Sequence, residues 1–208
     1  ERFGIKELVP AYLNPSVAFQ DLVTGVSFAS SGSGLDNLTA ATLSVIPFWK
    51  QIEHFEEYRN RLCELMGYQN ARTMLNRAIV FITVGTNDFI ANYFLQPTRP
   101  SQYNVNDYQE FLVQTYSSYI QKLYSLDVRR IGLINLPPLG CLPFEKTLRF
   151  LQGRGACVEE INYAASGFNS KLVTMIEGLK TQLPLGLKIV SLDYYSLVLD
   201  AIKSPHQY

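Results

Sequence analysis

The sequence has no excess of charge of either sign, because eighteen basic residues balance eighteen acidic ones among its 208 residues. A protein that attracts nucleic acid or an anionic membrane surface over a long range carries a basic excess, and this chain has none. No apolar run in it approaches the roughly 20 residues that a membrane-spanning helix needs. The composition therefore predicts neither a nucleic-acid partner nor a transmembrane segment.

Patterns typical of metal and nucleotide sites are also lacking. The three cysteines form no Cys-x-x-Cys pair, and the two histidines do not lie at zinc-site spacing from them. No Gly-x-Gly-x-x-Gly or P-loop pattern follows an apolar run, and the glycine-rich stretch SSGSG has no lysine or arginine beside it. We expect no metal and no cofactor.

The chain does have 47% hydrophobic residues, enough for one domain with a sizeable core. Strand-like segments alternate along it with longer helical ones. We expect strands at 22–29, 78–84, 130–136 and 187–192, and helices at 44–66, 106–126 and 156–183. This order is typical of parallel strands joined by right-handed crossovers, with helices covering both faces of the sheet. It predicts a single three-layer α/β domain over residues 1–208.

The two helices expected at 44–66 and 106–126 each carry apolar residues at steps of three and four, which predicts one buried stripe per helix. The first stripe comprises Ile46, Trp49, Ile52, Phe55, Tyr58, Leu62 and Leu65. The second comprises Tyr108, Phe111, Leu112, Tyr116, Tyr119 and Leu123.

The stretch AIVFITVGTNDF, residues 78–89, is apolar until Gly85 and then turns polar. Ligands of open parallel sheets bind outside the carboxyl ends of the strands, which is where this change falls. A side-chain amide from Asn87 and a backbone N–H from Gly32, which follows the strand expected at 22–29, would meet there as an oxyanion hole. An ordinary turn or helix cap at Asn87 is the alternative that the residues leave open.

Three stretches in this order and spacing carry a family resemblance: GVSFASSGSG at 25–34, VGTNDF at 84–89 and LINLPPLGCLP at 133–143. Together they resemble the plant GDSL esterase/lipases, which are members of the SGNH hydrolase superfamily. The resemblance spans essentially the whole chain and includes GIKELVPAYLNP, CVEEINYAASGFNSKL and DYYSLVLDAIKSPHQY. It implies a flavodoxin-like SGNH fold and a serine hydrolase that cleaves lipid or other acyl esters through an acyl-enzyme.

The resemblance assigns the oxyanion hole to Gly32 and Asn87, with Asp88 anchoring the loop rather than reacting. Ser27 stands where the family usually has Asn, and this difference puts little of the assignment in doubt. The larger departure is that the sequence contains neither Gly-Asp-Ser nor Asp-x-x-His, the family's sources of the nucleophile, acid and base. We therefore expect a domain truncated at both ends, without its first, central strand, and we expect this chain alone to be inactive and poorly stable.

A second catalytic group within the chain has weak support. GVSFA around Ser27 only loosely resembles a nucleophile elbow. His54 is expected on a solvated helix face and His206 in a frayed end. Asp193 is expected to cap a turn or helix, and Asp200 to lie on a solvated helix. The alternative to an esterase is therefore a non-catalytic pseudoenzyme or binding module. The sequence identifies no protein partner.

The resemblance also implies secretion, and with it a disulfide between Cys141 and Cys157; two reduced thiols are the alternative. Cys63 is expected to be a small buried apolar residue. The sequon Asn37-Leu38-Thr39 makes Asn37 a candidate for glycosylation.

Overall fold

The structure is a computed structural model that describes residues 6–150, 156–183 and 186–207. Its sheet has three parallel strands in the order β1 (Val80–Thr83), β2 (Arg130–Ile134) and β3 (Lys188–Leu192). The register places Val80 opposite Ile131, and Ile131 opposite Ile189. The α/β class and the parallel sheet are confirmed.

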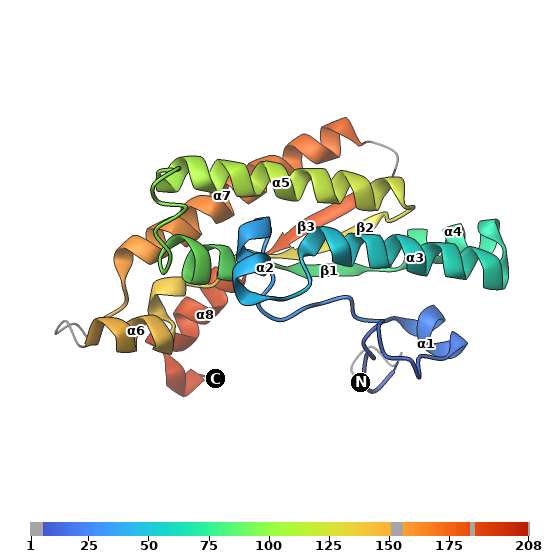
Figure 1. Cartoon of the computed structure of the whole chain (residues 1–208), viewed down its shortest axis with the longest axis horizontal. Coiled ribbons are helices and arrows are strands. Elements are labelled where there is room, and N and C mark those ends of the chain that lie inside the picture. The colour runs from blue at the N-terminus through green and yellow to red at the C-terminus, as the bar shows by residue number, and fades with distance from the viewer. Residues whose placement is uncertain (1–5, 151–155, 184–185, 208) are drawn as a thin grey trace.

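Helices connect and flank these strands (Figure 1). They are α1 (Phe19–Thr24), α2 (Asn37–Leu43), α3 (Phe48–Met66), α4 (Tyr68–Arg77), α5 (Val105–Ser125), α6 (Pro143–Phe150), α7 (Glu159–Gln182) and α8 (Tyr194–Lys203). Short turns are the π-helical η1 (Asp88–Tyr93) and the 3-10 turns η2 (Leu139–Cys141) and η3 (Pro205–Gln207). The helices expected at 106–126 and 156–183 correspond to α5 and α7.

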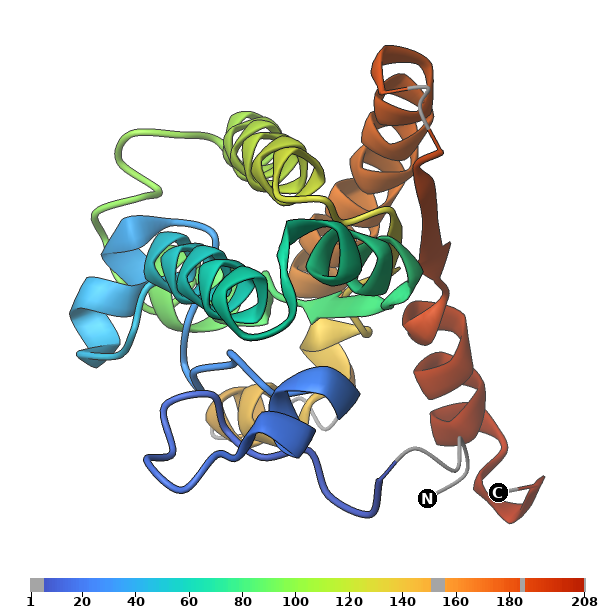
Figure 2. The same ribbon diagram turned by 90° about the vertical axis from the view of Figure 1, so that its right-hand side faces the viewer.

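The main core lies between the sheet and the two crossover helices. Helix α5 connects β1 to β2, helix α7 connects β2 to β3, and the two pack side by side over the same face of the sheet (Figures 1 and 2). Fully buried side chains fill this layer, and burying each one stabilises the fold by about 1.5–3 kcal/mol. They include Tyr108, Leu112 and Ile120 of α5, Phe168 and Leu172 of α7, and Ile131 and Leu133 of β2.

The other face of the sheet is exposed in this chain. The side chains of Ile79 and Phe81 are 57% and 56% exposed, and Val190 and Leu192 on β3 are also exposed. The ring of Phe81 lies over Gly132, where an added β-carbon would come within 2.8 Å of that ring. The expectation that helices cover both faces of the sheet is therefore not met within the described residues, where β1 is an edge strand.

The strand expected at 22–29 is also wrong. Its first part is the end of α1, where Leu22 is fully buried and the Thr24 hydroxyl donates to the Gln20 carbonyl. Gly25 ends this helix at φ +120°, and Ser27 then pairs with Ala11 in a single isolated bridge. A local helical turn thus takes up apolar residues that the sequence pattern alone assigns equally well to a strand.

Helix α3 begins later than expected and buries a narrower stripe. Ser44 ends α2 in the left-handed conformation, Pro47 is the N-cap of α3, and the helix starts at Phe48. Trp49 and Leu65, both expected in the core, are 42% and 51% exposed. The expected stripe was too wide because periodicity identifies a face but not the neighbours that cover its margins. No helix in the described ranges is long and apolar enough to cross a bilayer.

Candidate active site

The candidate site begins at the carboxyl end of β1, where the chain turns sharply. Gly85 has a φ of +116°, which side chains of L-residues rarely adopt. A β-carbon there would also lie 3.1 Å from a methyl group of Leu136. Asn87 follows as the N-cap of η1. The glycine therefore lets the chain leave the sheet and places Asn87 beside the end of the strand.

Asn87 contacts the loop that contains Gly32. Its amide donates to the carbonyl oxygen of Ser33 at 2.9 Å, and Ser33 directly follows Gly32, whose φ is +84°. Two segments more than 50 residues apart in the sequence thus meet at this rim. The assignment of Gly32 and Asn87 as an oxyanion hole stays a prediction.

Asp88 fastens the two segments together. Its carboxylate is fully buried and accepts hydrogen bonds from the N–H of Leu35 at 2.8 Å and of Asp36 at 3.0 Å. The hydroxyl of Thr39 donates to it at 2.6 Å. The expectation that Asp88 anchors the loop is confirmed by these contacts. A β-carbon on Gly34 would collide with the carboxylate, so the close approach of loop and carboxylate requires glycine there.

A second buried carboxylate, which the sequence reasoning missed, extends this anchor. Asp36 caps α2 through the N–H of Leu38 and forms a two-point ion pair with Arg99, at 2.6 and 2.7 Å. The hydroxyl of Tyr108 and the amide of Asn92 each lie 3.1 Å from it. An Asp just before a helix is recognisable as a cap, but no local pattern points to an arginine 63 residues away.

The two carboxyl groups have opposite pKa shifts. Burial raises the pKa of Asp88 to about 7, against the hydrogen bonds from Thr39 and the backbone. For Asp36 burial also acts upward, but the hydrogen bonds from Arg99, the Leu38 N–H and Tyr108 outweigh it and hold its pKa below the usual value. The arginine therefore keeps one carboxylate charged, while the second is held by neutral donors alone.

The alternative catalytic residues are not brought together. Among the described residues, no hydrogen bond joins Ser27 to either histidine. His54, expected on a solvated helix face, is half-buried on α3 against the ring of Tyr12, and His206 lies in the exposed turn η3. Asp193 caps α8 by accepting from the N–H of Ser196, which confirms its expected role.

The described residues include no group of three or more His, Cys, Asp or Glu that could hold a metal.

Asp200 lies in α8, on its exposed side, as expected. Cys63 is half-buried rather than buried. Asn37 is exposed at the start of α2, whereas the sequon's Thr39 is fully buried and hydrogen-bonded.

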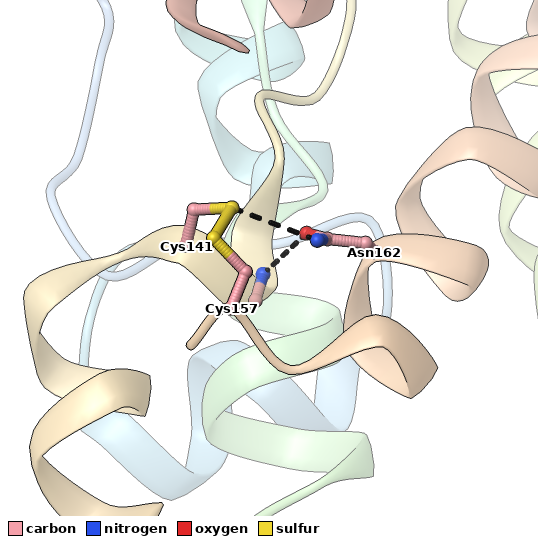
Figure 3. Close-up of a disulfide and its surroundings, with 4 residues drawn as sticks. Cys141, Cys157 and Asn162 are labelled. Atoms are coloured by element: carbon pink, nitrogen blue, oxygen red, sulfur yellow. Dashed lines mark hydrogen bonds between the residues drawn. A yellow bond between two sulfur atoms is a disulfide. The ribbon is translucent and has the colours of Figure 1, made fainter. Parts of the chain in front are cut away.

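Cys141 and Cys157 form the expected disulfide, which joins η2 to the chain just before α7 (Figure 3). Asn162 of α7 supports it: its side-chain oxygen accepts from the N–H of Gly140 at 2.9 Å, and its amide lies 3.6 Å from the sulfur of Cys141. Residues 151–155 of the loop that the disulfide closes lie outside the described ranges. The bridge thus holds the segment after β2 against α7.

Comparison with known proteins adds to this geometry. The family model of GDSL-like lipases and acylhydrolases matches residues 1–203. The Arabidopsis thaliana proteins GDSL esterase/lipase At4g26790 and At2g04570 are 40% and 41% identical to the whole chain. GDSL esterase/lipase APG of the same plant is 36% identical over 99% of the chain. The chain spans 59% of the length of the first two relatives and 58% of the third.

Proposed function

The chain belongs to the family of GDSL-like lipases and acylhydrolases, and on that basis we propose that the complete protein is a serine ester hydrolase acting on lipid or other acyl esters. A serine from outside this chain attacks the ester carbonyl, and the alcohol leaves to give an acyl-enzyme. Water then attacks the acyl-enzyme and releases the acid. A histidine from outside this chain moves the protons, and an aspartate, also from outside this chain, orients that histidine and stabilises its charged form.

In this proposal the chain supplies the oxyanion hole. The carbonyl oxygen becomes negative in each tetrahedral intermediate, and the N–H of Gly32 and the amide of Asn87 stabilise that charge. The observation that carries this role is the contact between Asn87 and Ser33. An amide NH2 has two hydrogens, so one can hold the Ser33 carbonyl and fix the orientation while the other donates to the oxyanion.

Replacing Asn87 tests the proposal. We expect Asn87→Ala in the full-length protein to lower kcat for p-nitrophenyl ester hydrolysis by about 10²–10³, because one oxyanion donor is lost. The exposed residue Asn60 on α3 provides a matched control, and Asn60→Ala should leave kcat unchanged. If Asn87→Ala stays within a few fold of the wild type, the oxyanion assignment is wrong.

The runner-up is a non-catalytic binding protein, and covalent labelling separates the two. A fluorophosphonate probe should label the full-length wild-type protein at one serine and should not label the 208-residue chain, which has no Gly-Asp-Ser. A full-length protein that neither hydrolyses esters nor accepts the probe would favour the binding protein.

We also propose that the protein is secreted. The disulfide between Cys141 and Cys157 supports this, because such bonds persist in oxidising compartments. Peptide mapping of the native protein under non-reducing conditions tests the bond in its own compartment, and a glycan on Asn37 would be detected in the same map. Reduced cysteines in the native protein would contradict the proposal.

A further inference from the structure

A basic cleft lies at the end of the sheet opposite to the candidate active site. It has a volume of about 490 Å³ and is lined by Arg72, Asn76, Arg129, Arg130, Gly186 and Lys188. Arg130 and Lys188 are the first residues of β2 and β3, whereas Asn87 follows the carboxyl end of β1 (Figure 1). The cleft is therefore separated from the proposed ester chemistry by the length of the strands.

The charges in the cleft are of one sign. Its described lining includes four cations and no acidic residue, in a chain whose net charge is zero. Arg130 and Lys188 are direct partners in the register of β2 and β3, so their side chains leave the sheet side by side. Like charges directly opposite each other destabilise a sheet. Neither side chain has a hydrogen bond or ion pair with a described residue, so nothing in the described chain offsets their repulsion.

The other two cations are held in place. A nitrogen of Arg129 donates to the backbone carbonyl of Tyr124 at 2.7 Å, and its guanidinium lies 3.9 Å from the centre of the Tyr124 ring. Arg72 lies 3.3 Å from a carboxylate oxygen of Asp127, but Asp127 is already paired with Arg59 at 2.9 Å. One carboxylate is thus shared by two arginines, and the cleft keeps a positive excess.

We propose that this cleft binds the phosphate group of a phosphorylated ligand. Guanidinium groups match the geometry of phosphate oxygens with paired N–H donors, and two of the three arginines are already oriented. A dianion placed between Arg130 and Lys188 would remove their mutual repulsion. The volume is in the range of small-molecule sites, so the cleft has room for the organic part of a phosphate ester as well.

Calorimetric titration of the full-length protein with glycerol 3-phosphate, at constant ionic strength, tests the proposal. We expect saturable binding that Arg130→Ala and Lys188→Ala each weaken by roughly ten- to a hundredfold, as the loss of a charged hydrogen bond implies. Lys203→Ala is the matched control, since Lys203 is an exposed lysine at the end of α8, outside the cleft. It should bind like the wild type. Absence of saturable binding, or equal affinity in all variants, would overturn the proposal.

Thermal melting shows whether a variant loses binding merely because it is misfolded. Without phosphate, Lys188→Ala should melt no lower than the wild type, because the substitution removes a repulsion. Inorganic phosphate should then raise the Tm of the wild type more than that of the variant. Phosphate stabilises folded proteins in general, so the difference between the two proteins is the measure of the site. Equal shifts would contradict a phosphate site.

The phosphate group can belong to a soluble ester or to a lipid headgroup. Sedimentation with vesicles of phosphatidylcholine containing phosphatidic acid distinguishes the two. Binding to the vesicles that Lys188→Ala abolishes would identify a headgroup, whereas binding of glycerol 3-phosphate alone would identify a soluble ester. Ester hydrolysis should be unchanged in Lys188→Ala in either case, because the cleft lies at the opposite end of the strands.

Discussion

Asp88 is a buried carboxyl group whose surroundings only partly favour its charge. It accepts three hydrogen bonds, from the Thr39 hydroxyl and two backbone N–H groups, yet burial and the nearby Asp36 carboxylate raise its pKa to about 7. The group joins the loop of Gly32 to the turn of Asn87. The geometry of the proposed oxyanion hole therefore depends on a residue that is not one of its two donors.

The raised pKa makes a prediction about stability and pH. A group whose pKa is higher in the folded state favours folding below its unfolded pKa, near 3.8, and this contribution is lost as the pH rises through about 7. We expect the free energy of unfolding of the full-length protein to include a decline between about pH 4 and pH 7 that Asp88→Asn removes. Urea unfolding at both ends of this window measures it.

Asp193→Asn is the matched control for this measurement. Asp193 is an exposed helix cap whose pKa the hydrogen bonds from Ser196 and Asn135 lower, so it loses its proton on the acid side of this window. Asp193→Asn should leave the slope of stability against pH unchanged. An unchanged slope in Asp88→Asn would show that Asp88 is charged throughout the window.

Gly34 is required by the same contact. We expect Gly34→Ala to destabilise the full-length protein by about 1–3 kcal/mol, because its β-carbon would force the Asp88 carboxylate away from its donors. Esterase activity should fall with it. Gly178 in α7 provides the contrast: a β-carbon there meets no atom within 4 Å, so Gly178→Ala should stabilise the helix by about 0.5–1 kcal/mol. Chemical denaturation measures the free energy of unfolding of both variants. It shows whether the clash of the added β-carbon or the loss of glycine's backbone freedom determines the change at each position.

Elements that follow β2 depend on a covalent link. The disulfide spans 16 residues, and closing such a loop stabilises the fold by about 3 kcal/mol in the chain-entropy model. We expect Cys141→Ser combined with Cys157→Ser to lower the free energy of unfolding by about that amount. Cys63→Ser, which removes a half-buried free thiol, should cost less. Equal losses in the two variants would mean that the bridge contributes nothing beyond the packing of its sulfurs.

At the scale of elements, the helices show which types and boundaries the apolar periodicity predicts correctly and which it does not. Val105–Ser125 lies within one residue of the helix expected at 106–126, because a long apolar stripe marks it locally; the structure adds that Asn104 caps it. The strand expected at 22–29 failed because a short apolar run suits a strand and a helical turn equally well. The start of α3 at Phe48 depended on where the neighbouring helix ends, at its C-cap Ser44. The apolar pattern gives no signal for that end.

At the scale of the whole molecule, the uncovered face of the sheet is the main feature. Phe81 and Val190 are direct neighbours of Gly132 on this face, and both are more than half exposed. We propose that segments of the complete protein outside this chain cover them, since the chain spans only 59% of its relatives' length. The same apolar surface favours aggregation when the 208-residue chain is isolated.

The isolated 208-residue chain is therefore expected to melt at a lower temperature, and less cooperatively, than the full-length protein. It should bind the dye ANS through the exposed sheet face, whereas the full-length protein should not. Comparing melting curves and ANS fluorescence of the two proteins tests this expectation. A cooperative melt without ANS binding would show that the chain is a self-sufficient domain.

Local pattern was sufficient for the parallel α/β class, the long crossover helices and the placement of Asn87 just past a strand end. Gly32 was assigned to the same rim after a strand at 22–29 that the structure does not have. The sequence was also sufficient, through family resemblance, for the disulfide. The Asp36–Arg99 ion pair, the donors that hold Asp88, the basic cleft and the exposed face of β1 came from the packed structure. Each of these joins residues far apart in the chain or reflects what covers a surface, and such contacts leave no periodic trace in the sequence around either partner.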